Sequence, residues 1–181
     1  MRSLAVVATV VVIALSTVVA GAAAATAAPA SVAITVAAGV TKPYEPGADA
    51  ITYRPDLVPA GAKLSVFGIS RTRWTKVLLA VHGLVANRQY GAHVHVQPCG
   101  AAPADAGPHF QHREDPVQPS VDPAYANPAN EIWLDLTTDA NGDAVTFTHV
   151  EWSFGGRRAG SVVLHETHTH TGPGQAGTAG A

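Results

Sequence analysis

The chain has 181 residues, of which 47% are hydrophobic and 13% charged, and its formal net charge at pH 7 is −2. With 11 lysines and arginines against 13 acidic residues, it lacks the basic excess of a nucleic-acid-binding protein. The low charged fraction also argues against a solvated linker, so we expect a folded globular protein.

The first 27 residues have the pattern of a secretory signal peptide. Arg2 precedes an uncharged apolar run at residues 4–20, and the alanine-rich residues 21–28 offer small-residue cleavage sites such as 25–27. A membrane anchor or a lipoprotein is the alternative, but the run is short for a span of about 20 apolar residues, and no cysteine follows it closely to take a lipid. We therefore predict cleavage of residues 1–27 and a secreted, extracytoplasmic protein with no stable membrane span. Loss of Arg2 lowers the net charge to about −3.

Residues 28–48, rich in alanine, valine, glycine and proline, are expected to form a loose N-terminal leader. Residues 49–181 remain for the folded part, and a chain of that length is sufficient for one domain with one hydrophobic core.

The folded part is predicted to be all-β. It has no convincing helical period, and short apolar-alternating runs are separated instead by glycine, proline and asparagine, which favours an antiparallel sandwich or barrel. These runs occupy residues 50–53, 62–69, 74–81, 90–97, 131–138, 144–150 and 161–166. Asn141-Gly142, within residues 139–143, predicts a type I′ turn. Residues 98–130 form a long connection that is expected to be functional.

Four histidines are the candidate metal ligands. His93 and His95 lie two residues apart on a predicted strand, so both imidazoles point to one face and can share an ion. His109 lies in the long connection and His165 follows the last predicted strand. Four imidazoles around one ion make a nitrogen-rich ligand set, which suits copper better than a hard cation.

The contexts of these histidines resemble the copper motifs of the copper/zinc superoxide dismutases. The matching segments are 93–95 (His-Val-His), 107–110 (Gly-Pro-His-Phe) and 163–166 (Val-Leu-His-Glu), in the family's order, and residues 139–142 are similar to a hairpin of that family. The turn at residues 98–100 (Pro-Cys-Gly) is similar to the secreted bacterial branch. The resemblance covers residues 51–181.

This resemblance implies a Greek-key β-barrel or sandwich in which His93, His95, His109 and His165 bind copper. The implied reaction converts two superoxide anions and two protons to dioxygen and hydrogen peroxide. His109 matches the family's bridging histidine and is the implied catalytic residue, because its release from copper and its uptake of a proton would supply a proton for peroxide.

The chain departs from the family at the zinc site. The family binds zinc with the bridging histidine, two further histidines and an aspartate. In this chain, residues 111–130 contain a single histidine, His112. Asn130 and Glu131 stand where the aspartate is expected. We therefore expect zinc to be absent or its site incomplete, and Glu131 is the candidate partner for the second ring nitrogen of His109.

The chain also departs from the family at its C-terminal end. The family pairs the counterpart of Cys99 with a second cysteine, but Cys99 is the only cysteine here. Residues 177–181 resemble the turn that precedes the family's anion-guiding arginine and last strand, so we expect a barrel with its last strand missing and an open edge through which the protein could self-associate. Arg113, Arg157 or Arg158 could replace the guiding arginine. A truncated product is favoured over a specialised short form, because three linked features are lost at one point.

The sequence leaves open the roles of the remaining histidines and the choice between several functions. His82 and His149 are expected to be ordinary surface residues, and His168 and His170 either capture copper or lie in a solvated loop. The leading function is an exported copper-dependent superoxide dismutase-like enzyme. The alternatives are a non-catalytic copper-binding protein that lost its steering arginine and closing strand, and a structural β domain with vestigial histidines.

Overall fold

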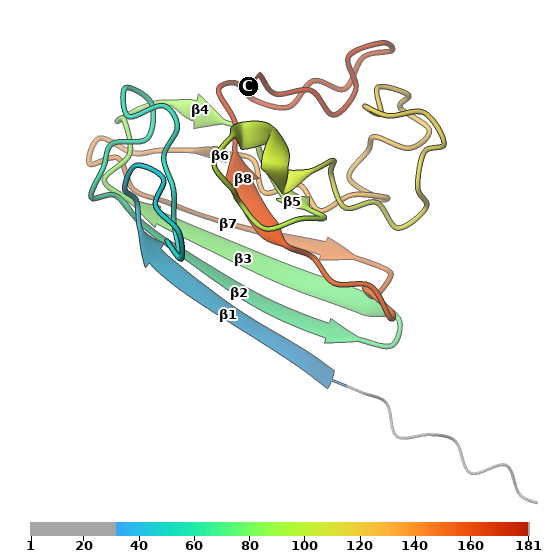
Figure 1. Ribbon diagram of the computed structural model, residues 1–181. Coiled ribbons are helices and arrows are strands. Elements are labelled where there is room, and N and C mark those ends of the chain that lie inside the picture. The colour runs from blue at the N-terminus through green and yellow to red at the C-terminus, as the bar shows by residue number, and fades with distance from the viewer. Residues whose placement is uncertain (1–31, 181) are drawn as a thin grey trace, which may run out of the picture.

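The regular structure of the protein is almost entirely β (Figure 1). The computed structural model describes residues 32–180. Its strands are β1 (Val32–Val40), β2 (Lys63–Arg71), β3 (Trp74–His82), β4 (Gln89–Tyr90), β5 (Ala92–His95), β6 (Leu136–Thr137), β7 (Ala144–Val150) and β8 (Ser161–Leu164), and one 3₁₀ turn, η1, spans Pro103–Ala106. The all-β prediction is confirmed. No helix within residues 32–180 is long and apolar enough to cross a membrane.

The largest sheet has four antiparallel strands in the order β1-β2-β3-β7. Its first strand corrects the expected leader at residues 28–48, because Val32–Val40 pair in register with all of β2, from Val32 opposite Arg71 to Val40 opposite Lys63. The small and β-branched side chains of β1 fit a pleated strand, and the pairing satisfies the backbone along one edge. The predicted signal peptide, residues 1–27, lies outside the described residues.

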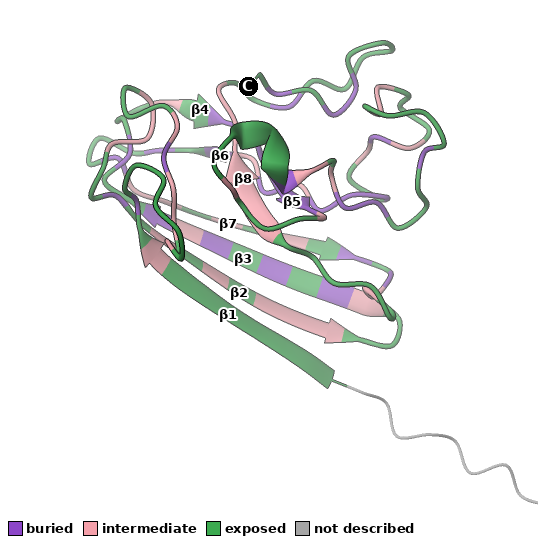
Figure 2. Ribbon diagram, in the orientation of Figure 1, coloured by how far each residue is buried: buried purple, intermediate pink, exposed green. Residues whose placement is uncertain are grey.

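The core lies between the large sheet and the short strands above it (Figure 2). β3 alternates buried and exposed positions, and its buried side chains Val77, Leu79 and Val81 point toward the core. The pairs β4-β6 and β5-β8 supply the opposite wall of the core, and every residue of β5 is buried. This places β5, which carries the His-Val-His motif, in the interior of the protein.

Three of the predicted strands differ from the observed structure. Of residues 131–138, only Leu136–Thr137 form a strand, and Glu131 and Trp133 make isolated bridges. Residues 50–53 form no strand and make only a single bridge, between Ile51 and Lys42. Residues 90–97 are interrupted at Gly91, whose N–H donates to the carbonyl of Thr167 instead of continuing a strand ladder. The interruption separates β4 from β5 and lets the C-terminal segment approach the backbone there.

The turn at residues 139–143 is present but is not the predicted type I′ turn. Gly142 has a positive φ of 81°, whereas Asn87 is the only non-glycine residue with a positive φ among the described residues, so Asn141 does not have one. The carboxylate of Asp139 accepts hydrogen bonds from the backbone N–H groups of Asn141 and Asp143. These side-chain bonds stabilise a different turn from the one that Asn-Gly alone favours.

Candidate metal centre

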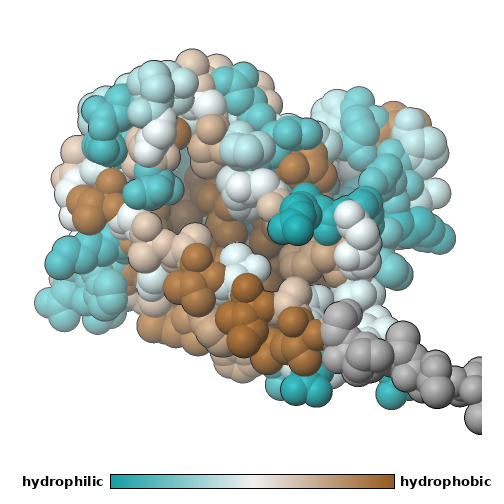
Figure 3. Space-filling view, turned by 60° about the horizontal axis from the view of Figure 1, so that its bottom comes forward, coloured by the Kyte–Doolittle hydropathy of each residue, from teal (hydrophilic) through white to brown (hydrophobic). Residues whose placement is uncertain are grey.

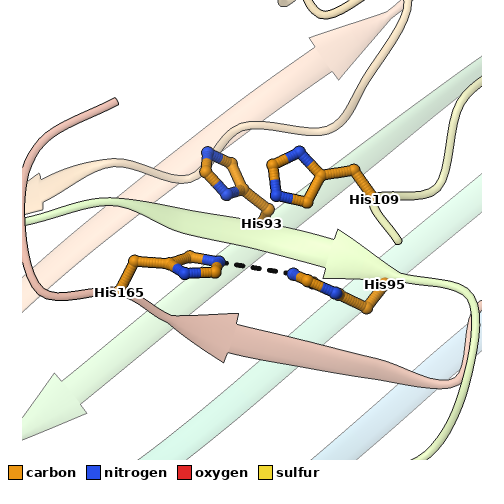
Figure 4. A group of neighbouring side chains, drawn as sticks. All are labelled: His93, His95, His109 and His165. Atoms are coloured by element: carbon orange, nitrogen blue, oxygen red, sulfur yellow. Dashed lines mark hydrogen bonds between the residues drawn. The ribbon is translucent and has the colours of Figure 1, made fainter. Parts of the chain in front are cut away.

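The four predicted ligand histidines converge on one point in the structure (Figure 4). One ring nitrogen from each of His93, His95, His109 and His165 lies within 4.8 Å of the others. The expectation that these residues meet is therefore confirmed, and the cluster could hold a metal ion.

Strand pairing brings the three segments together. His93 and His95 lie on the same face of β5, which pairs with β8 from Ala92 opposite Leu164 to His95 opposite Ser161. His165 follows β8 directly, and its N–H donates to the carbonyl of Gly91 at 2.8 Å. His109 forms an isolated antiparallel bridge with His95. Two short pairings to β5 thus position the two distant histidines.

Three of the imidazoles use their outer ring nitrogen to bind an acceptor that has no proton to give. His95 Nδ1 lies 2.7 Å from the carbonyl of Gly107, and His165 Nδ1 lies 3.2 Å from the carbonyl of Gly180. His109 Nδ1 lies 2.9 Å from Glu131 Oε2. A carbonyl or an ionised carboxylate can only accept, so each of these Nδ1 atoms carries the hydrogen and each Nε2 keeps a lone pair.

His93 has the opposite tautomer. Its Nε2 lies 2.7 Å from the hydroxyl of Thr169, and that hydroxyl donates to Asp135 Oδ1 at 2.7 Å. Since the hydroxyl proton is already used, Nε2 of His93 is the donor and Nδ1 keeps the lone pair. This Nδ1 is buried and has no hydrogen-bond partner among the described residues. A buried polar atom without a partner is costly, unless it serves a ligand.

Four lone pairs therefore point into one small space. The clearest sign is the separation of 3.3 Å between Nε2 of His95 and Nε2 of His165, marked by the dashed line in Figure 4. Because the outer nitrogens carry the hydrogens, the two Nε2 atoms face each other as acceptors. A cation between them would turn this repulsion into coordination, so the residues present fit a bound metal ion.

The protonation of the cluster also favours metal binding. Burial, together with the neighbouring His109, lowers the pKa of His95 to about 4. Burial likewise lowers the pKa of His165 to about 4, and it holds the pKa of His93 well below the ordinary value. These three imidazoles are neutral at pH 7, and neutral imidazole is the form that binds a metal.

Glu131 is the acceptor at the centre of a buried hydrogen-bond network. Its side chain is 1% exposed. Oε2 accepts from His109 Nδ1 at 2.9 Å and from Trp133 Nε1 at 2.6 Å, and Oε1 accepts from the side-chain amide of Gln111 at 2.8 Å. Glu131 is thus the partner of His109 that the sequence indicated, and its three donors compensate the burial of a carboxylate.

The segment after β8 covers the site, which the sequence did not indicate. It has no strand, as expected, but it folds back so that Thr167 N–H donates to the carbonyl of Ala179 and Gly177 N–H donates to that of His170. Ala179 is buried. The segment supplies two of the hydrogen-bond partners described above, the hydroxyl of Thr169 and the carbonyl of Gly180.

A cavity of about 460 Å³ opens beside the cluster and reaches three of its histidines. Its lining includes Gln118 and Ser120 of the long connection and residues 177–180 of the covering segment, but among the described residues it contains no lysine or arginine. Arg157 instead binds Glu114. The guanidinium of Arg113 lies 4.5 Å from the ring centroid of Tyr125. Neither of these arginines lines the cavity, and Arg158 does not line it either.

The other histidines lie outside the cluster. His112, the one nitrogen ligand of the long connection, stacks on Trp152 with ring centroids 5.1 Å apart, so it does not join His109 in a second site. His82 and His149 are exposed and face Asp143 and Glu151. The remaining pair consists of His170, which is exposed, and His168, whose Nδ1 lies 3.1 Å from Asp135 Oδ2.

A comparison of the chain with known protein families, with curated proteins and with solved structures found no match. The function is therefore inferred from the residues of the chain, above all from the geometry of the four imidazoles and of their hydrogen-bond partners.

Proposed function

We propose that the four-histidine cluster binds one copper ion. The observation that carries this proposal is the set of four inward lone pairs, whose ring hydrogens all point outward to protein acceptors. Imidazole nitrogen suits copper, whereas magnesium and calcium prefer oxygen ligands. Among the described residues, one carboxylate contacts a ligand ring at hydrogen-bond distance, that of Glu131, and it binds the outer nitrogen of His109. In this proposal the carboxylate orients a ligand and is not itself one.

We propose further that the protein is an exported, superoxide dismutase-like enzyme with a Greek-key β-barrel architecture. The resemblance of its histidine motifs supports this, together with the cavity beside the cluster, which could admit a diatomic anion. When bound, copper would supply the one-electron chemistry, taking an electron from one superoxide and giving it to the next. Two superoxide anions and two protons would yield one dioxygen and one hydrogen peroxide.

The protein's own contribution in this proposal is proton delivery by His109. Its Nδ1 hydrogen is held by Glu131, so Nε2 is the nitrogen that can gain and lose a proton on the cluster side. A proton on Nε2 would make the ring a cation directly beside the Glu131 carboxylate, and this ion pair is buried at the carboxylate end. Glu131 would thereby orient the ring so that Nε2 faces the cluster.

A non-catalytic copper-binding protein is the second candidate function. The absence of lysine and arginine from the described lining of the cavity favours it, because a fast dismutase gains rate from cations that attract its anionic substrate.

An experiment on copper-loaded protein distinguishes the enzyme from the copper-binding protein. Bound copper per chain and superoxide consumption are measured on the same sample, with a chelator present to remove free copper. Stoichiometric copper with rapid consumption that falls in His109→Ala supports the enzyme. Stoichiometric copper without consumption above the copper-free protein supports the binder, and no bound copper would overturn both proposals.

A further inference from the structure

Several strands in the described part of the chain have a partner on one edge only, and β1 and β8 are two of them. In the part of the chain that the structure describes, β1 pairs only with β2, and β8 pairs only with β5. In an antiparallel pair, alternate N–H and C=O groups point away from the partner strand. The free edges of β1 and β8 therefore present hydrogen-bonding groups, and such an edge is a template for a further strand.

The two free edges line the same groove. A cavity of about 590 Å³ is lined by residues 37–39 of β1, by residues 160–166, which include β8, and by residues 48–54 of the connection that follows β1. Successive side chains of a strand point to opposite faces, so a cavity that lies against one face of a strand contacts every second residue. This cavity contacts consecutive residues, which indicates that it lies along the edge of each strand. Figure 3 shows this face of the molecule hollowed, with hydrophobic side chains gathered around the hollow.

The floor of the groove is apolar. Leu64 and Val66 of β2 and Leu79 of β3 lie beneath it, together with Tyr90. Val66 and Leu64 are only partly buried although they face the core. An occupant with apolar side chains on one face would remove this surface from water.

The charges around the groove favour an uncharged occupant. Among the described lining residues three are charged, namely Asp49, Arg54 and Glu166, and His165 is neutral because burial lowers its pKa to about 4. Arg54 and Glu166 lie 3.7 Å apart and offset each other. β1 itself, Val32–Val40, contains no charged residue.

We propose that the groove between β1 and β8 binds an extended, uncharged polypeptide segment as an added strand. An extended polypeptide backbone has N–H and C=O groups along both of its edges, so it can form hydrogen bonds with β1 and with β8 at the same time. Its alternate side chains, if apolar, would contact the floor of the groove. β8 has four residues, Ser161–Leu164, so it can pair with about four residues of the added strand, roughly 13 Å. The segment must be free on both of its edges. A strand already paired within a second folded copy has only one free edge, so it could not bond to β1 and β8 together.

The proposal does not require a bound metal ion, although His165 of the cluster also lines the groove. Its test uses the full chain with a defined peptide. The probe has the sequence of β1, residues 32–40, with two lysines added for solubility. The control is the same peptide with proline at alternate positions, which removes N–H donors. Amide hydrogen exchange of β1, β3 and β8 is measured with and without excess peptide. We expect exchange in both β1 and β8 to slow by about tenfold or more, with no effect of the proline peptide.

A matched pair of variants tests whether the peptide binds on the groove side of β1. Ala37 lies opposite Val66, which faces the groove floor, whereas its neighbour Val36 lies opposite Phe67 on the other face of the sheet. Both positions are exposed. Ala37→Lys should abolish the protection and Val36→Lys should retain it, while unchanged exchange in β3 shows that each variant is folded.

Three results would overturn the proposal. The first is no protection in excess peptide. The second is protection of β1 alone, which would indicate pairing at a single edge. The third is protection of β1 that rises with protein concentration and needs no peptide, which would show that a second copy covers the groove.

Discussion

Gly91 and Ala179 are packed so closely that a side chain at position 91 cannot be accommodated. A methyl group on Gly91 would lie 2.6 Å from the Cβ of Ala179 and 2.7 Å from the carbonyl oxygen of Thr167. The close approach holds the covering segment against β5, and through it the hydroxyl of Thr169 against His93. The integrity of the metal centre therefore depends on a glycine that carries no ligand atom.

Gly91→Ala should displace the covering segment and weaken metal binding by about 10- to 100-fold, the range typical of lost hydrogen-bond partners of metal ligands. The dissociation constant for copper, measured by competition with a chelator, checks this. Gly172→Ala is the matched control, because it lies in the same segment with open space around its Cβ position. Equal affinities of the two variants would contradict the proposed role of the segment.

Glu131→Gln should lower copper affinity and dismutation together. The carboxylate of Glu131 accepts from three donors, and an amide in its place would direct an N–H group at one of them. We expect a 10- to 100-fold loss of affinity, as is typical when the partner of a ligand histidine is replaced. The exposed Glu151 is the control position. An unchanged dissociation constant in Glu131→Gln would show that this network does not orient His109.

The metal-free protein should lose stability as the pH falls from about 6.5 to about 4. The pKa values of His95 and His165 are lowered to about 4 in the folded state, so in this range the unfolded chain binds more protons than the folded one. The free energy of unfolding then decreases by on the order of a few kcal/mol as the pH falls. Denaturant unfolding at several pH values measures this. His165→Gln should flatten the dependence, and an unfolding free energy that stays constant down to pH 4 contradicts the burial of these rings.

Superoxide consumption should depend little on ionic strength. The described lining of the cavity beside the cluster contains no lysine or arginine, so there is no attraction for salt to screen. Gln118→Lys places a cation at an exposed position of that lining, and it should raise the rate at low salt, whereas Val36→Lys, on the outer face of the sheet, should not. A steep fall of the wild-type rate with added salt would reveal a steering charge that this account lacks.

The parts of the fold that depend on local pattern were predictable. Alternation placed His93 and His95 on one face, and β7 has the predicted bounds, residues 144–150. β1 was missed because its run of small residues, with no charge to mark an exposed face, resembles a flexible leader as closely as a strand. The strand forms because β2 offers it a complete antiparallel edge, which is a tertiary contact.

The four-histidine cluster was predictable as a set of residues but not as a hydrogen-bonded site. The meeting of His109 and His165 with β5 followed from the resemblance of their contexts, not from their spacing. Thr169 was missed because its contact with His93 joins residues 76 positions apart, and a segment rich in glycine and threonine gives no local signal for such a contact. Glu131 could be indicated in advance because a ligand imidazole needs a partner for its outer nitrogen.

Electron paramagnetic resonance of the chain loaded with one equivalent of Cu(II) tests directly whether the four histidines bind one copper ion. Four inward imidazole lone pairs predict one copper per chain in a single environment, with hyperfine coupling to nitrogens of bound imidazole. His93→Ala should change this spectrum, whereas His82→Ala should not. A spectrum unaffected by His93→Ala, or one with copper distributed over several exposed histidines, would contradict the account.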